Sequence, residues 1–133
     1  MLEDKLLFRT RQGLVETNLQ GFNQDFLFFA TATILLAPLL EEALFRGLAL
    51  RAYRRLLPGL GSRLRFWLWG TLSTVAFSLV HGESFTHLAP HALIFGYILW
   101  RIAVSRGFWN AVVAHSAYNL TAILLALVFS SAA

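Results

Sequence analysis

The chain has 133 residues, of which 57% are hydrophobic and only 14% are charged, and its formal net charge is +4. A soluble domain of this length cannot bury so much apolar surface, so the composition favours a membrane protein of about one domain. The basic residues cluster at the ends of apolar segments instead of covering one face, which argues against a nucleic-acid binder. Because the chain has no cysteine, a disulfide, a cysteine nucleophile and a thiolate metal site are all excluded.

The N-terminal part, residues 1–21, mixes acidic and basic residues and has no continuous apolar stretch. It does not fit a secretory signal peptide, and we expect an interfacial or flexible segment. Residues 22–133 are predicted to form one core, because no repeat, linker or low-complexity tract divides them.

The first hydrophobic segment starts near Phe22 and carries no charge from Phe26 to Leu40. It is predicted to continue as helix through the charged stretch APLLEEALFRGLALR to about Leu57, where a proline and two glycines follow. Charge is therefore expected within a helix that otherwise has the composition of a membrane span.

Three further segments run from Phe66 to about His81, from Leu88 to Val104 and from Phe108 to about Phe129. A spanning helix needs roughly 20 residues, and the first three segments reach this length only if their polar residues lie inside the bilayer. The predicted fold class is therefore all-α, a polytopic membrane helical bundle with about four transmembrane helices.

Arginines crowd the connection between the first two segments and the connection between the last two. The positive-inside bias predicts a multi-pass integral membrane protein with loops Leu57–Arg65 and Arg101–Gly107 in the cytoplasm. At about 1.5 Å per helical residue, Glu41 then lies roughly 15 to 21 Å from this boundary. His81, His115 and Asn119 also reach the middle of the bilayer or near it, so polar side chains from three helices are predicted to meet at one level.

Glu41 and Glu42 are about 100° apart around a helix, so they cannot point in the same direction. Glu42 and Arg46 stand at i,i+4 with the glutamate first, which is the favoured order for an ion pair. Glu41 is left without a local partner at a depth where a carboxylate needs one, and we expect a partner from another helix. A purely structural role, as an ion-paired contact between helices, stays open for both glutamates.

His81 closes the stretch FSLVH, and His115 and Asn119 lie one helical turn apart in HSAYN. Each of these alone is as easily a helix cap or a polar contact between helices. Together with Glu41 they form a set in which a carboxylate and an imidazole activate water while a second imidazole and an amide stabilise an oxyanion. This set suits peptide hydrolysis without a protein nucleophile.

Other hydrolytic chemistries are served less well. The only aspartates, Asp4 and Asp25, cannot form an intramembrane dyad, and no H-E-x-x-H or G-x-S-x-G stretch occurs, although a serine route stays open. Zinc remains open as a cofactor, because a glutamate and two histidines could bind it with water as the fourth ligand: Glu41, His81 and His115. His87 and His91 form another i,i+4 pair that could serve water or substrate access.

Three stretches resemble the motifs of the CPBP family, the CAAX-protease and bacteriocin-processing intramembrane proteases, also called Abi. EEALFR at Glu41–Arg46 resembles the E-E-x-x-x-R motif, FSLVH at Phe77–His81 the F-x-x-x-H motif, and HSAYN at His115–Asn119 the H-x-x-x-N/D motif. The resemblance covers about Leu39 to Thr121. Three motifs in the right order on separate apolar segments make it fairly specific.

The resemblance implies that Glu41 and His81 activate the hydrolytic water and that His115 and Asn119 stabilise the oxyanion. Glu42 and Arg46 would support this site. A metal-independent glutamate protease is favoured over a metalloprotease, because Asn119 suits a hydrogen-bond donor better than a zinc ligand. No cofactor is therefore favoured, with zinc as the open alternative.

The leading hypothesis is an intramembrane endopeptidase that cleaves a membrane-associated protein or peptide. The alternative is a non-catalytic subunit or assembly module of a larger membrane protein complex, since family members commonly have additional helices that this chain does not contain. A homo-oligomer could also close its lipid-facing sides. The expected partners are thus the substrate, the lipid bilayer and such a complex or second copy, with no nucleic acid.

Overall fold

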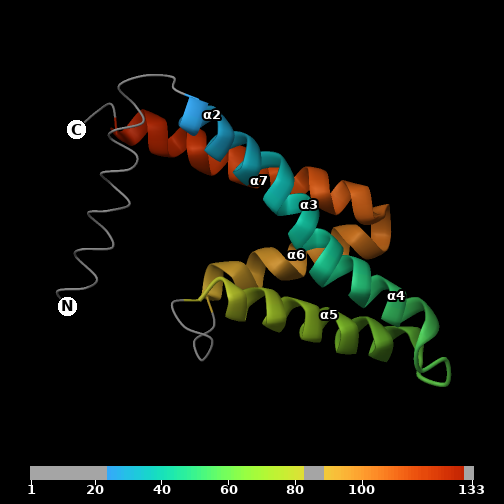
Figure 1. Cartoon of the computed structure of the whole chain (residues 1–133). Coiled ribbons are helices and arrows are strands. Elements are labelled where there is room, and N and C mark those ends of the chain that lie inside the picture. Colours follow the sequence, from blue (N-terminus) through green and yellow to red (C-terminus); the bar gives the residue numbers. More distant parts are fainter. Residues whose placement is uncertain (1–23, 83–88, 131–133) are drawn as a thin grey trace.

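The computed structural model describes residues 24–82 and 89–130, and these residues form helices and short connections (Figure 1). Four helical rods and no strand occur in this part of the chain, so the predicted all-α membrane bundle is confirmed. The predicted N-terminal segment 1–21 and His87 lie outside the described residues.

The first rod is continuous from Gln24 to Arg55, because every junction along it keeps right-handed helical dihedral angles. Two of its turns are π-helical, so they hold one more residue than an α turn does. Its parts in chain order are α2 (Gln24–Thr31), η1 (Ala32–Leu36), α3 (Ala37–Glu42), η2 (Ala43–Gly47) and α4 (Leu48–Arg55). The helix therefore continues through the charged stretch, as the sequence predicts.

The other rods are α5 (Ser62–Val80), α6 (Pro90–Arg106) and α7 (Phe108–Ser130). Both predicted arginine-rich loops are shorter than the sequence suggests. Arg63 and Arg65 lie in the first turn of α5, and the stretch after Arg101 is still helical. Arginine is a good helix former, and it is also favourable in the last turn of a helix, where it faces the negative end of the dipole.

A single residue, Gly107, separates α6 from α7. Its φ of 99° lies in a region that a residue with a Cβ rarely adopts, and this conformation ends α6 and starts α7 at once. The reversal keeps the start of α7 beside the end of α6.

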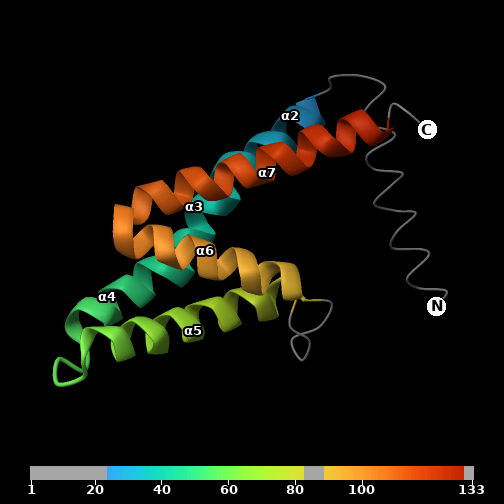
Figure 2. The same cartoon turned by 180° about the vertical axis from the view of Figure 1, so that it is seen from behind.

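The long first rod changes neighbours along its length. α2, η1 and α3 run beside α7, whereas η2 and α4 pack on α5, and α5 and α6 form an antiparallel hairpin (Figures 1 and 2). The α2–α7 pair and the α5–α6 hairpin diverge from one another in both views. The middle of the first rod, which carries the glutamates, lies where these two pairs meet.

Aromatic packing holds the end of the bundle that contains α4 and the start of α5. Trp100 is fully buried there, its indole nitrogen donates to the Phe66 carbonyl at 3.2 Å, and Ala49, Leu50 and Ala103 surround it. A Cβ on Gly70 would lie 2.3 Å from the Trp100 indole nitrogen, so glycine is needed at this contact. The hairpin and α4 therefore pack as a close-fitting unit.

Two rods are long and apolar enough to cross a membrane, Gln24–Arg55 and Phe108–Phe129. Only 11% of the apolar window of each is buried inside the protein, so these helices present leucine and phenylalanine side chains on the outside. A surface this apolar matches lipid rather than water. Both helices are therefore candidate membrane spans.

Candidate active site

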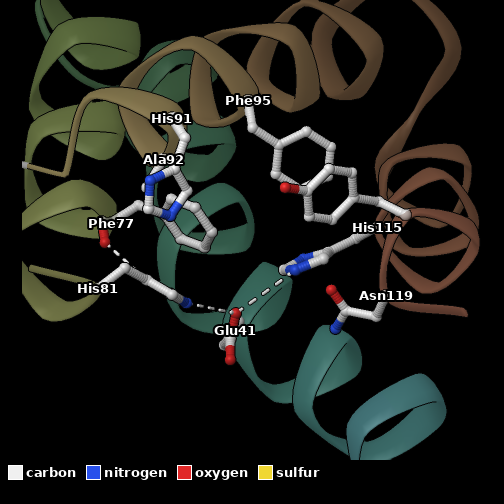
Figure 3. Close-up of a pocket in the computed structure, with 9 residues that line it drawn as sticks. Glu41, Phe77, His81, His91, Ala92, Phe95, His115 and Asn119 are labelled. Carbon is white, nitrogen blue, oxygen red and sulfur yellow. Dashed lines mark hydrogen bonds and ion pairs between the residues drawn. The ribbon is translucent and has the colours of Figure 1, made fainter. Parts of the chain in front are cut away.

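Polar side chains from all four rods line one pocket of about 110 Å³, drawn in Figure 3. Glu41 comes from the end of α3, His81 directly follows α5, and His115 and Asn119 lie on α7. The structure thus brings together at one pocket the four residues that are predicted to be catalytic. The full lining is Glu41, Phe77, His81, His91, Ala92, Phe95, His115, Tyr118 and Asn119.

Glu41 is the centre of this group. Its Oε2 lies 3.4 Å from Nε2 of His81 and 3.6 Å from Nε2 of His115 (Figure 3). These distances are long for direct hydrogen bonds, and Oε2 accepts none from the described residues although it is buried. The carboxylate therefore has a free acceptor oxygen directed at two imidazoles beside an open pocket.

His81 is oriented by its own helix. Its Nδ1 lies 2.8 Å from the carbonyl oxygen of Phe77, one turn earlier. Because a carbonyl can only accept, Nδ1 carries a proton, and Nε2 is the ring nitrogen that faces Glu41, as an acceptor when the ring is neutral. The Phe77 ring also packs on the imidazole, with the two centroids 4.2 Å apart. The sequence order F-x-x-x-H thus fixes both the ring position and the tautomer.

Glu42 points away from the pocket and is completely buried. Its Oε1 lies 3.1 Å from Nη1 of Arg46, which is the i,i+4 pair that the sequence predicts. The same oxygen accepts a hydrogen bond of 3.0 Å from Nδ1 of His115, and sequence reasoning missed this contact. No local spacing could have indicated it, since 73 residues separate the two positions. Glu42 therefore orients His115 from behind.

Arg46 is equally buried and connects Glu42 to the α5–α6 hairpin. Its Nη2 donates to the Gly96 carbonyl at 3.0 Å, and its guanidinium lies 4.2 Å from the centre of the Phe77 ring. A Cβ on Gly96 would lie 3.0 Å from the same nitrogen, so glycine keeps this approach open. The buried charge thus has an ion pair, a carbonyl and an aromatic face as partners, while its Nε and Nη1 have no hydrogen-bond partner among the described residues.

Asn119 makes a contact that the sequence does not reveal. Its side-chain nitrogen donates to the carbonyl oxygen of Thr33 in η1 at 2.9 Å. One of its two N–H groups is thus used between helices, and the predicted oxyanion role falls to the other. In Figure 3 the Asn119 nitrogen is on the side of the glutamate helix and the oxygen on the side of His115.

The segment that carries both glutamates is tied to each of the other rods by one bond from a side chain to a carbonyl. Asn119 of α7 bonds the carbonyl of Thr33, Arg46 bonds the carbonyl of Gly96 in α6, and Ser73 of α5 donates to the Phe45 carbonyl at 3.0 Å. Two of these accepting carbonyls belong to π turns, whose widened ladder makes carbonyls available to other donors.

A metal ion has less support from this geometry. Among residues 24–82 and 89–130, no group of three His, Asp or Glu side chains is arranged to hold one. This includes the set Glu41, His81 and His115 that the sequence offers as zinc ligands.

His91 lies on the pocket rim contributed by α6 (Figure 3). It is exposed and makes no contact with the glutamates that would give it a role in the chemistry. The predicted access role of the pair with His87 stays a prediction, because His87 is outside the described residues.

A glutamate and two histidines thus lie around a pocket inside an apolar helical bundle, and ionisable residues in such a place mark a candidate functional site. A sequence model described as "Type II CAAX prenyl endopeptidase Rce1-like" matches residues 23–121, and the chain belongs to this family. The family agrees with the resemblance to CAAX-type intramembrane proteases. No curated protein and no solved structure matches the chain significantly.

Proposed function

We propose that this chain is an intramembrane endopeptidase that hydrolyses a peptide bond of a membrane-associated protein or peptide. The observation that carries the proposal is the position of Glu41 Oε2, an acceptor that faces Nε2 of His81 and Nε2 of His115 at 3.4 and 3.6 Å. Membership of the prenyl endopeptidase family supports the same reaction class.

The first step is activation of water. A water in the pocket can donate one hydrogen to the exposed part of the Glu41 carboxylate and the other to Nε2 of His81 when that ring is neutral, since both groups line the pocket. As the water oxygen attacks the substrate carbonyl, one proton passes to Glu41. The products of this step are a tetrahedral intermediate with an oxyanion and a protonated glutamate.

Stabilisation of the oxyanion falls to α7. His115 has Nδ1 engaged by Glu42, so it donates from Nε2 when both ring nitrogens carry protons, and the adjacent Glu42 carboxylate compensates that charge. The second N–H of Asn119 is the other available donor. Collapse of the intermediate breaks the C–N bond, and the proton held by Glu41 passes to the leaving amine.

The orientation in the membrane is part of the proposal. The arginines at the end of α4, in the first turn of α5 and in the last turns of α6 lie together at one end of the α5–α6 hairpin. The positive-inside bias places this end in the cytoplasm, with all four rods crossing the bilayer. The two shorter rods, at 19 and 17 residues, are within the range of spanning helices.

The experiment uses the purified chain in lipid vesicles with a set of membrane-anchored peptides, some prenylated and some not. We expect wild-type protein to cleave at least one of them and Glu41→Gln and His81→Ala to abolish cleavage at unchanged folding. Thr121→Ala is the matched control, because this exposed hydroxyl only bonds its own helix at Ala117.

Retention of the wild-type rate by a folded Glu41→Gln variant would overturn the proposal. Absence of cleavage of every peptide, combined with stoichiometric co-purification with a larger membrane complex, would favour the assembly role instead. A chain that purifies alone and is active would count against that role.

A further inference from the structure

Pro38 is an imino acid inside the helix that carries the glutamates, and its ring is fully buried. Just before it, the backbone N–H of Ala37 bonds the carbonyl of Ala32, five residues back, which is the π-helical pattern. In the same pattern the next N–H would bond the carbonyl of Thr33. Residue 38 has no N–H, so this bond cannot form.

The carbonyl oxygen of Thr33 is instead bonded by the side-chain nitrogen of Asn119, at 2.9 Å and from a helix 86 residues away in sequence. A carbonyl inside a bundle needs a donor, because an unpaired buried backbone group is costly and lipid supplies none. The Asn119 amide supplies the donor that Pro38 lacks. Because its nitrogen must face the Thr33 carbonyl, this bond determines the orientation of the Asn119 amide in the pocket.

We propose that Pro38 is a positioning residue of the site. By leaving the Thr33 carbonyl without a backbone donor, it reserves this oxygen for the Asn119 amide and so holds the amide at the pocket with its second N–H available. The effect of Pro38 on catalysis rests on the proposed function, whereas its coupling to Asn119 is a property of the fold alone.

Replacing Pro38 with alanine tests the coupling in either helical pattern. If the π turn persists, the new N–H at residue 38 bonds the carbonyl of Thr33. If the turn relaxes to α-helix, the N–H of Ala37 bonds the same carbonyl, four residues back. Both outcomes give this oxygen a backbone donor, and neither leaves it dependent on Asn119.

The first experiment is a double-mutant cycle on thermal unfolding in detergent, with Pro38→Ala, Asn119→Ala and the double variant. Asn119→Ala lowers the midpoint in the Pro38 background, because the Thr33 carbonyl is left unpaired. We expect this shift to shrink to about half or less in the Pro38→Ala background, since interacting sites are not additive. Additive shifts would overturn the coupling. Thr121→Ala, on the same helix, should be additive with Pro38→Ala.

The second experiment measures steady-state kinetics of the same variants on a peptide that the wild type cleaves. We expect Pro38→Ala to lower kcat by between about 10-fold and 100-fold with little change in KM, because a displaced donor weakens the transition state more than substrate binding. The change should nearly vanish when Asn119 is already alanine.

Together the two experiments distinguish a failure of the proposed function from a failure of the positioning role of Pro38. An inactive wild type with a non-additive unfolding cycle would remove the proposed function and leave the coupling standing. An active wild type, with Pro38→Ala at full kcat or equally slowed with and without Asn119, would overturn the positioning role while the proposed function survives.

Discussion

Glu41 and Glu42 are neighbours in the chain, yet the structure places them in opposite environments. Glu42 is sealed, and its Oε1 contacts Arg46 at 3.1 Å and His115 at 3.0 Å. Glu41 keeps 28% of its side chain exposed, and its Oε2 faces the imidazoles of His81 and His115 at 3.4 and 3.6 Å. About 100° of helix rotation separates a carboxylate that is compensated from one that is available for chemistry.

The difference also shows how a membrane helix accommodates two acids. The sealed glutamate neutralises a buried arginine and orients a histidine, so its charge is used within the protein. The open glutamate depends on the pocket and the histidines around it. Substitution of the buried Glu42 should therefore lower stability, whereas substitution of the exposed Glu41 should lower activity alone.

The largest expected effect is that of Glu41→Gln, which changes the exposed glutamate. We expect the cleavage rate to fall by about 10² to 10⁴, the range that a general base contributes, with an unchanged unfolding midpoint. Steady-state rates and thermal unfolding of the same preparation check both parts. A lowered midpoint with an unchanged rate per folded molecule would reverse the assignment of the two glutamates.

Glu42→Gln should remove the buried ion pair between Glu42 and Arg46. It leaves the Arg46 guanidinium buried without its ion pair, and removing one partner of such a pair costs about 3–5 kcal/mol. Denaturation in mixed micelles measures the loss. The double variant Glu42→Gln/Arg46→Met removes both charges and should recover much of the stability, and a double variant as unstable as the single one would contradict the pairing.

Gly70→Ala should damage packing far from both glutamates. The added methyl would lie 2.3 Å from the Trp100 indole nitrogen, so we expect about 1–3 kcal/mol of destabilisation. Gly59→Ala is the matched control, because nothing lies within 4 Å of its Cβ position. The rate per folded molecule should stay at the wild-type value in both variants, and a selective loss of activity in Gly70→Ala would show that the two regions are not independent.

The smallest expected effect is that of a metal chelator. If Glu41 and His81 activate water directly, incubation with a chelator leaves the rate unchanged, and elemental analysis of the active protein finds less than one zinc per chain. A chelator-sensitive rate that zinc restores, with one zinc bound per chain, would show instead that Glu41 and the two histidines form a metal site.

Local spacing in the sequence was enough to predict much of this arrangement. The i,i+4 spacing predicted the Glu42–Arg46 pair, and helix angle left Glu41 without a local partner. Depth counted from the arginines placed His81 and His115 at the level of Glu41, and the structure has both near it.

Contacts between distant segments and irregular backbone could not be predicted in this way. The bond from His115 to Glu42 and the bond from Asn119 to the Thr33 carbonyl depend on how α7 meets the first rod, which no local pattern records. The first π turn had one local signal, Pro38, whose missing N–H disturbs the helical ladder. The sequence predicts that α5 starts at Phe66, but the helix starts at Ser62. The arginines around Arg63, which the sequence analysis assigns to the loop, form its first turn.

The two π turns bear on how this helix tolerates insertions and deletions. Each turn, at 32–36 and 43–47, holds one surplus residue relative to a regular helix. Deleting a single residue from either would restore the regular ladder and leave the rotation between the two flanking parts unchanged. Relaxation of a turn to α-helix at full length would instead rotate one part by about 100° relative to the other. Relaxation of the first turn would turn the glutamates away from Asn119, and relaxation of the second would turn them away from the α4 packing face. The two π turns, and not only the residue types, therefore decide which side chains of this helix face the pocket.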